Sequence, residues 1–111
     1  MTIMTITPHL SLTLRRGNMR ERYIEEKLVS AVKAAGGIAP KFISPGLAGM
    51  PDRLVLLPGG KMAFVEVKSP GMKPRPLQLK RHDTLRQLGF KVFVLDDHCE
   101  IGGMIDEIQA P

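Results

Sequence analysis

A turn sequence between two strand-forming segments is the feature that most constrains the fold of this chain. Residues 52–57 and 61–68 are rich in strand formers, and Pro58-Gly59-Gly60 separates them. This pattern predicts a β-hairpin. If the loop has three residues, Leu57 pairs with Lys61, and the numbers of all paired residues add up to 118.

That register sets Asp52 directly opposite Glu66. Directly opposed residues have Cβ atoms about 4.5–5.5 Å apart on one face of the sheet, so two carboxylates would meet there. Lys68 projects from the same face as Glu66, because side chains alternate along a strand. A loop one residue longer or shorter would send the two carboxylates to opposite faces.

Helical and turn patterns surround this hairpin. We expect, in chain order, a helix from about Arg20 to Gly36-Gly37, a possible short strand over Lys41–Ser44, a loop over Pro45–Pro51, the hairpin, a helix from Pro76 to about Leu88, a strand over Lys91–Leu95 and a short final helix over about Glu100–Ile108. In the helix that follows the hairpin, Leu77, Leu85 and Leu88 are expected to share the inward face. The order of elements predicts a mixed α/β domain with a small central sheet.

Composition limits the classes of protein to which the chain can belong. The 111 residues, of which 43% are apolar, are enough for one domain, which we assign to residues 19–111. Residues 1–18 are interpreted as a leader or disordered tail, because they lack the features of a secretion signal. The single cysteine, Cys99, excludes an internal disulfide and favours a reducing cytosol, and no apolar run approaches the roughly 20 residues needed to cross a bilayer.

The charge balance favours a polyanionic partner. Sixteen Lys and Arg against eleven Asp and Glu give a net charge of +5, while only 5% of the residues are aromatic. A base-stacking single-strand binder would need more aromatic residues than this. The segment from Lys68 to Lys91 carries seven basic residues against Asp83 alone, a local charge of +6. Its residues Lys73, Arg75, Lys80 and Arg81 are the candidates for phosphate contacts, the alternative being a solvated helix face.

The two opposed acids favour a metal site. Like charges held this close repel unless a cation lies between them, and Mg²⁺ prefers a few carboxylate oxygens plus water. A metal held by Asp52 and Glu66 could activate a water, with Lys68 orienting it, for phosphodiester hydrolysis. The alternative is three solvated residues on an exposed strand. Glu66 and Lys68 favour the metal site because they interrupt an apolar strand that looks central.

The extended series of residues around these acids resembles the PD-(D/E)XK nucleases, and within them the virus-type replication and repair (VRR-NUC) branch. The matching segments are Ile24-Glu25, Gly36-Gly37, Lys41-Phe42, Gly49 to Arg53, Phe64 to Pro70 and Gln78. The resemblance implies a restriction-endonuclease-like αβββαβ core, with a small mixed sheet flanked by helices, that cleaves DNA with Mg²⁺ or Mn²⁺. It implies Asp52 and Glu66 as metal ligands, the Val67 carbonyl oxygen as a further ligand, Lys68 at the nucleophile, and Gln78 supporting the site from the next helix.

The family also implies an acidic residue on the first helix. Glu25 is our candidate metal ligand, because helical geometry sets it beside Leu28 and Val32 on the inward stripe. Glu21 points in a similar direction, but an acid in the first turn is commonly explained by the helix dipole.

Two further features are interpreted as structural. Asp96-Asp97-His98-Cys99-Glu100 is expected to form a capping turn rather than a metal site, because one His and one Cys cannot complete the usual zinc set. His82 is expected to be a surface residue that could contact DNA.

The sequence therefore predicts a metal-dependent DNA endonuclease of phage-type replication and repair. Because one compact site cuts one strand, a homodimer acting on branched DNA such as Holliday junctions is the specific expectation. The alternatives are a flap or duplex nuclease and a basic DNA-binding protein without catalysis. The expected location is the cytoplasm of a bacterial or phage-infected host cell.

Overall fold

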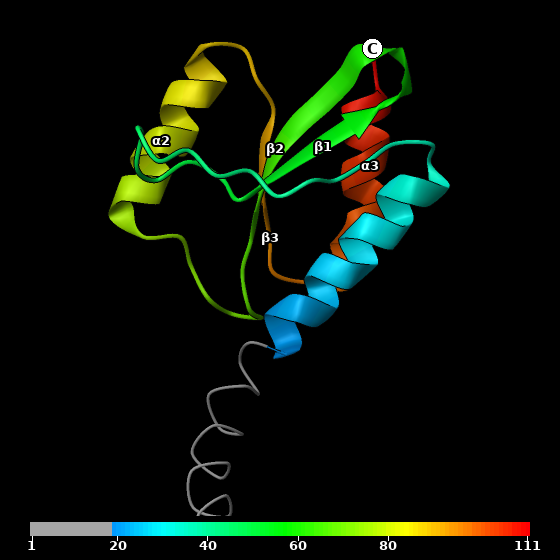
Figure 1. The fold of residues 1–111 in the computed structure, drawn as a ribbon, viewed down its shortest axis with the longest axis horizontal. Coiled ribbons are helices and arrows are strands. Elements are labelled where there is room, and N and C mark those ends of the chain that lie inside the picture. The colour runs from blue at the N-terminus through cyan, green and yellow to red at the C-terminus, as the bar shows by residue number, and fades with distance from the viewer. Residues whose placement is uncertain (1–18) are drawn as a thin grey trace, which may run out of the picture.

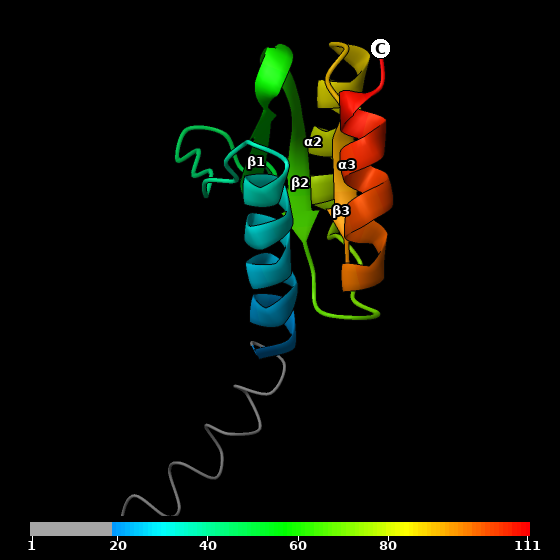
Figure 2. The same ribbon diagram turned by 90° about the vertical axis from the view of Figure 1, so that its right-hand side faces the viewer.

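The computed structural model describes residues 19–111. The predicted leader, residues 1–18, lies outside this range. A three-stranded sheet with the strand order β1-β2-β3 forms the centre of the domain. A first helix (residues 19–34) and α3 (Ile101–Gln109) cover one face, and α2 (Pro76–Gln87) covers the other (Figure 1, Figure 2). This arrangement confirms the predicted α/β class. No helix in the described range is long and apolar enough to cross a membrane.

The hairpin has the predicted register. β1 (Arg53–Leu57) and β2 (Lys61–Val67) are antiparallel, and their pairs run from Leu57↔Lys61 to Arg53↔Val65. The short 3-10 turn η1 (Pro58–Gly60) joins them. β3 (Val92–Leu95) pairs with β2 in parallel, which makes the sheet mixed.

The expected strand over Lys41–Ser44 is wrong. The chain instead follows β1 through two isolated bridges, Ile38↔Leu56 and Lys41↔Arg53. Between them Pro40 accepts a hydrogen bond from the N–H of Leu54 but has no N–H to return, so a continuous ladder cannot form. The sheet therefore has three strands, and the preceding segment only borders its edge.

Glycine ends the first helix at the predicted place. Gly36 has a φ of +90°, and the N–H groups of Gly36 and Gly37 donate to the carbonyl oxygens of Lys33 and Val32. These two bonds form a Schellman motif, which a residue with a Cβ adopts only at a cost. The chain then turns back toward the edge of β1.

Two apolar clusters hold the layers together. The larger one joins the first helix and α3 to one face of the sheet, with Leu28, Val55, Val65 and Ile108 almost fully buried. The smaller one joins Phe64, Leu85 and Val92 on the α2 face. Since side chains alternate along β2, Glu66 projects on the same side as Phe64, toward α2.

The predicted inward face of α2 is confirmed for Leu85 but is wrong for Leu77 and Leu88. Leu77 and Leu88 are 48% and 69% exposed, and the buried residues are Gln78, His82 and Leu85. The helix ends at Gln87, so Leu88 is its C-cap rather than part of a stripe. α2 packs with a polar face inward because Glu66 lies beneath its first turns.

The last elements were predicted correctly in outline. The turn η2 (His98–Glu100) leads directly into α3. Ile101, Met104, Ile105 and Ile108 of α3 are buried, whereas Gly102 and Gly103 lie on its exposed side. The two glycines do not prevent the helix because its apolar face is stabilised by packing.

Candidate active site

Asp52 lies where the loop before the hairpin joins β1. Its Oδ1 accepts a hydrogen bond of 3.1 Å from the backbone N–H of Val67. This contact ties the start of β1 to the end of β2, as the register of the hairpin requires. Burial raises the pKa of the Asp52 carboxyl, although the Val67 N–H opposes this change.

Glu66 is the most enclosed acid of the site, with only 3% of its surface exposed. Its Oε2 accepts a hydrogen bond of 3.2 Å from Gln78 Nε2 and lies 3.6 Å from Lys68 Nζ. Its Oε1 is buried and has no hydrogen-bond partner among the described residues. Burial, and then the charge of Asp52, raise the pKa of Glu66 from 4.5 to about 7, even though Lys68 lowers it.

This donor set fits a divalent cation. Burial raises the proton affinity of two neighbouring carboxylates, and the only ammonium within 4 Å of Glu66 among the described residues is that of Lys68. Oxygen ligands of this kind suit Mg²⁺ and Mn²⁺. Glu66 Oε1 is buried and has no hydrogen-bond partner among residues 19–111, which is unusual for a polar atom that serves folding alone.

Gln78 connects α2 to this carboxylate. Its Oε1 accepts a hydrogen bond of 2.8 Å from the backbone N–H of Arg75, and its Nε2 donates to Glu66. The side chain therefore caps the start of α2 and orients Glu66 at the same time. The structure thus brings Gln78 to the Glu66 carboxylate, and its supporting role in the site stays a prediction.

The first helix brings two acids to this end of the sheet. Glu25 Oε1 lies 3.3 Å from Arg53 Nη2, and Arg53 also donates to the carbonyl oxygen of Ala39 at 2.8 Å. Burial, and then the charges of Glu25 and Asp52, raise the pKa of Glu21. Glu25 is thus already paired with a guanidinium, whereas Glu21 makes no ion pair with any residue that the structure describes.

The structure differs from the sequence-based expectation for His82. It is fully buried, with 0% of its surface exposed, and its Nε2 lies 3.6 Å from Glu66 Oε1. Burial, and then the charges of Arg86 and Lys68, lower the pKa of the ring. One sequence signal could have revealed this position: His82 follows Gln78 by four residues and so shares its helix face.

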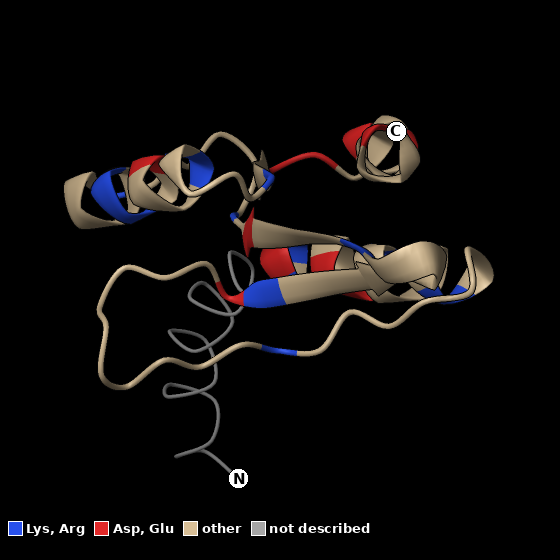
Figure 3. Ribbon diagram, turned by 90° about the horizontal axis from the view of Figure 1, so that it is seen from above, with Lys and Arg blue, Asp and Glu red and all other residues tan. Residues whose placement is uncertain are grey.

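The predicted phosphate contacts occupy different surroundings. Lys73, Arg75 and Lys80 are exposed, whereas Arg81 is half-buried and its Nε donates to the Ala48 carbonyl oxygen at 2.9 Å. Figure 3 shows basic positions along α2, to one side of the sheet. Two other basic residues of the segment bond to backbone oxygens: Arg86 to Val92 and Lys91 to Glu107.

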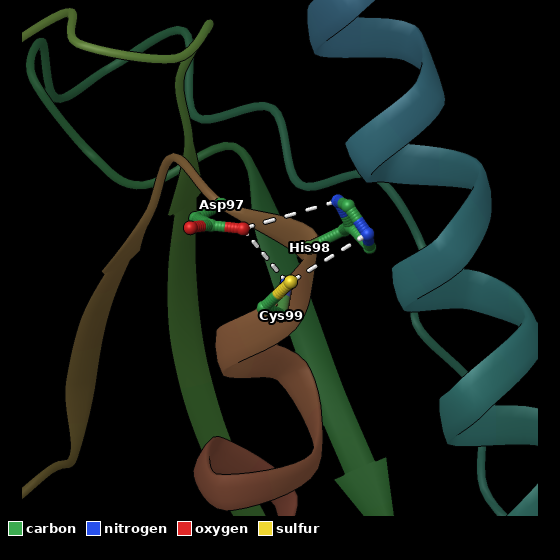
Figure 4. A group of neighbouring side chains, drawn as sticks. All are labelled: Asp97, His98 and Cys99. Atoms are coloured by element: carbon green, nitrogen blue, oxygen red, sulfur yellow. Dashed lines mark hydrogen bonds and ion pairs between the residues drawn. The ribbon is translucent and has the colours of Figure 1, made fainter.

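Asp97, His98 and Cys99 form the predicted capping turn (Figure 4). Asp97 is the N-cap of η2, and its Oδ1 accepts a hydrogen bond of 2.9 Å from the N–H of Cys99. The three potential ligand atoms lie within 4.8 Å of one another, but all three residues are exposed. The cap explains their proximity.

Known proteins share both sequence and fold with this chain. The protein "Putative nuclease p44" of Acyrthosiphon pisum secondary endosymbiont phage 1 is 59% identical over 78 residues, which make up 70% of this chain and 84% of that protein. A solved structure described as a VRR_NUC domain superposes with a TM-score of 0.73 and 34% identity, covering 78% of this chain and 95% of the other. No protein family model matches the chain.

The mixed sheet, its flanking helices and the carboxylate pair define an α/β nuclease domain. The chain belongs to the VRR-NUC family of nucleases, as the sequence resemblance indicated.

Proposed function

We propose that this nuclease is an endonuclease that cleaves DNA and depends on Mg²⁺ or Mn²⁺. The observation that carries the proposal is the pair of carboxylates, half-buried Asp52 and buried Glu66, with raised pKa values at adjoining strand ends. In this proposal Asp52 and Glu66 hold the cation. The Val67 carbonyl and Glu25 serve as further ligands, and Glu21 is the alternative acid from the first helix.

The cation, when bound, lowers the pKa of a water and offsets charge that develops on the phosphate. The residues of the chain contribute the rest of the chemistry. Lys68 lies 3.6 Å from Glu66, so its ammonium can orient the attacking water and help to balance charge at the scissile phosphate. Gln78 keeps the Glu66 carboxylate in its orientation through the bond to Oε2.

The basic residues of the segment between β2 and β3 would bind the DNA backbone. Lys73, Arg75 and Lys80 are exposed on the side of the domain formed by α2, and they support binding to a polyanion. We propose branched DNA, such as a Holliday junction, as the substrate and a homodimer as the active form, because paired cuts need two sites. The phage origin of the relative supports a role in replication and repair in the cytoplasm of an infected host.

Cleavage assays with labelled DNA test the function. Four-way, flap and linear duplex substrates are incubated with the protein and Mg²⁺, Mn²⁺ or EDTA. We expect cleavage only with a metal, and a loss of at least about 100-fold in Asp52→Asn and Glu66→Gln with DNA binding retained. Asp83→Asn, which changes an exposed acid on α2, is the matched control and should cleave normally.

Each outcome has a definite meaning. Undiminished cutting by Asp52→Asn or Glu66→Gln would contradict the assignment of the site. DNA binding without cleavage by the unmodified protein under every metal condition would favour a non-catalytic DNA-binding protein. Preferential cutting of flaps or duplexes would replace the branched substrate but retain the metal-dependent chemistry.

A further inference from the structure

His82 is a polar residue in a buried position. The requirements of folding alone do not explain why a polar side chain lies there. Its ring is completely enclosed, and neither Nδ1 nor Nε2 has a hydrogen-bond partner among the described residues. Buried polar groups are nearly always paired, and leaving one unpaired costs about 1–3 kcal/mol. A leucine at this place on α2 could extend the neighbouring apolar cluster of Phe64, Leu85 and Val92 without that cost.

The ion-pair partner that the structure describes for this ring belongs to the proposed metal site. His82 Nε2 lies 3.6 Å from Glu66 Oε1, which is itself buried and without a hydrogen-bond partner among the described residues. The other oxygen of the same carboxylate, Oε2, already accepts a hydrogen bond from Gln78. Gln78 and His82 are one helical turn apart on α2, so the nitrogen-bearing side chains of this helix lie next to both oxygens of Glu66.

We propose that His82 is a positioning residue for Glu66, donating a hydrogen bond from its Nε2–H to Oε1 when the carboxylate binds the metal. This inference rests on the proposed metal-dependent function. A carboxylate held by one hydrogen bond can still rotate about its last side-chain bond, for which the energy profile is broad. A second donor on the other oxygen fixes the plane of the carboxylate, and therefore the direction of its metal-binding lone pairs.

The distance of 3.6 Å between His82 Nε2 and Glu66 Oε1 is longer than a hydrogen bond, and this is compatible with the role. Hydrogen bonds in active sites are often long before the ligand is present and tighten in the complex. A hydrogen bond to an ionised carboxylate is also shorter and stronger than one to a neutral group. The donation requires only one N–H on an uncharged ring, so His82 needs no change of charge.

Three substitutions distinguish a role of His82 in positioning Glu66 from a role in packing alone. His82→Gln introduces a side-chain amide whose nitrogen can lie near the place of the histidine Nε2. The shorter side chain introduced by His82→Asn matches the place of Nδ1 instead, so it cannot reach Oε1. His82→Leu keeps a similar volume but has no donor.

Metal affinity is measured in the absence of DNA, without reading out cleavage. The protein is titrated with Mn²⁺, and electron paramagnetic resonance gives the concentration of free Mn²⁺ at each step. We expect His82→Leu and His82→Asn to bind Mn²⁺ about tenfold more weakly, because supporting residues of metal ligands typically contribute roughly 10–100-fold. His82→Gln should recover most of the affinity of the unmodified protein. Thermal unfolding in EDTA should show that His82→Leu is at least as stable as the unmodified protein.

Equal Mn²⁺ affinity in the unmodified protein and in His82→Leu would overturn the inference, as would equally weak binding by His82→Gln and His82→Leu. Failure of the unmodified protein to bind Mn²⁺ would overturn both this inference and the proposed function. Normal binding by the unmodified protein with no effect at His82 would overturn the inference alone.

If the leucine variant does not fold, ¹⁵N NMR of the unmodified protein tests whether His82 donates a hydrogen bond to Glu66. Mg²⁺ should shift the Nε2 resonance of His82 and slow exchange of its proton, and Glu66→Gln should abolish both effects. An unchanged His82 resonance at saturating Mg²⁺ would contradict the proposal.

Discussion

At the scale of single residues, we expect the Glu66 carboxyl to couple folding to the proposed metal binding. Its pKa of about 7, against an ordinary value of 4.5, means that the folded protein binds this proton more tightly than the unfolded chain. Between these two pH values the free energy of unfolding therefore falls as pH rises, because the folded protein must lose the proton and bury a charge. A bound cation would remove this cost, so metal affinity should increase as pH rises through about 7.

This coupling predicts that Glu66→Gln stabilises the metal-free protein at alkaline pH. In urea unfolding with EDTA at about pH 8, we expect the variant to exceed the unmodified protein by about 1–3 kcal/mol, because the buried charge is absent. Near pH 4.5, where the unmodified carboxyl is protonated in the folded chain and half protonated in the unfolded chain, the difference should become small.

Glu26→Gln is the matched control, since Glu26 is exposed on the first helix and its replacement should change little at either pH. A stability difference for Glu66→Gln that is the same under the acidic and the alkaline condition would contradict the coupling.

At the scale of elements, the loop before β1 is held in place by its close approach to α2. Gly49 has a φ of +84°, and a Cβ built on it would lie 2.8 Å from the backbone carbonyl oxygen of Leu77. Arg81 fixes the same loop from the next turn of α2 by donating to the Ala48 carbonyl. Asp52 follows Gly49 by three residues. The contact between this loop and α2 therefore positions Asp52 relative to the helix whose Gln78 side chain orients Glu66.

We therefore expect Gly49→Ala to destabilise the protein by about 1–3 kcal/mol, because alanine is strained at positive φ and meets backbone there. Urea unfolding measures the change, and cleavage should decrease with it as Asp52 is displaced. Gly46→Ala lies in the same loop with nothing within 4 Å of the added Cβ, so it should remain within about 0.5 kcal/mol of the unmodified protein. If both variants lose the same stability, the close approach is not what holds the loop.

At the scale of the whole molecule, the two faces of the sheet differ. One face packs against most of the apolar core, and the other lies beside the candidate site. The first helix and α3 enclose the larger apolar cluster on one face. α2 covers the other face (Figure 1, Figure 3), and the exposed basic residues Lys73, Arg75 and Lys80 lie on this helix and on the loop that precedes it. This arrangement predicts that DNA binds on the α2 side.

Lys80→Ala should weaken DNA binding and reduce the slope of log affinity against log salt concentration by about 1, as expected for the loss of one phosphate contact. Lys33→Ala removes an exposed lysine from the first helix, on the opposite face, and should leave that slope unchanged. Fluorescence anisotropy at several salt concentrations with a catalytically inactive Asp52→Asn background measures both. Equal changes of slope in the two variants would indicate that binding is not confined to the α2 side.

The hairpin, its register and the meeting of Asp52 with Glu66 were predictable from the sequence because their causes are local. The length of the turn at Pro58-Gly59-Gly60 determines which residues pair, and alternation then determines which side chains share a face. The end of the first helix was predictable for the same reason, since Gly36-Gly37 favours a Schellman motif wherever it occurs.

The inward face of α2 was decided only by the tertiary structure. The leucines of this helix do not form one consistent stripe, so local pattern could not choose between Leu77 with Leu88 and Gln78 with His82. The presence of the Glu66 carboxylate on the facing sheet selected the polar side. For the same reason the pairing of Glu25 with Arg53 could not be predicted from spacing, because it depends on a partner 28 residues away in the chain. The spacing of His82 from Gln78 places both on one face of α2, but only the tertiary structure shows that this face meets Glu66. The amino-acid sequence by itself determined which groups are candidates for the chemistry, because turn length and alternation act locally, and packing between distant segments determined which neighbours contact them.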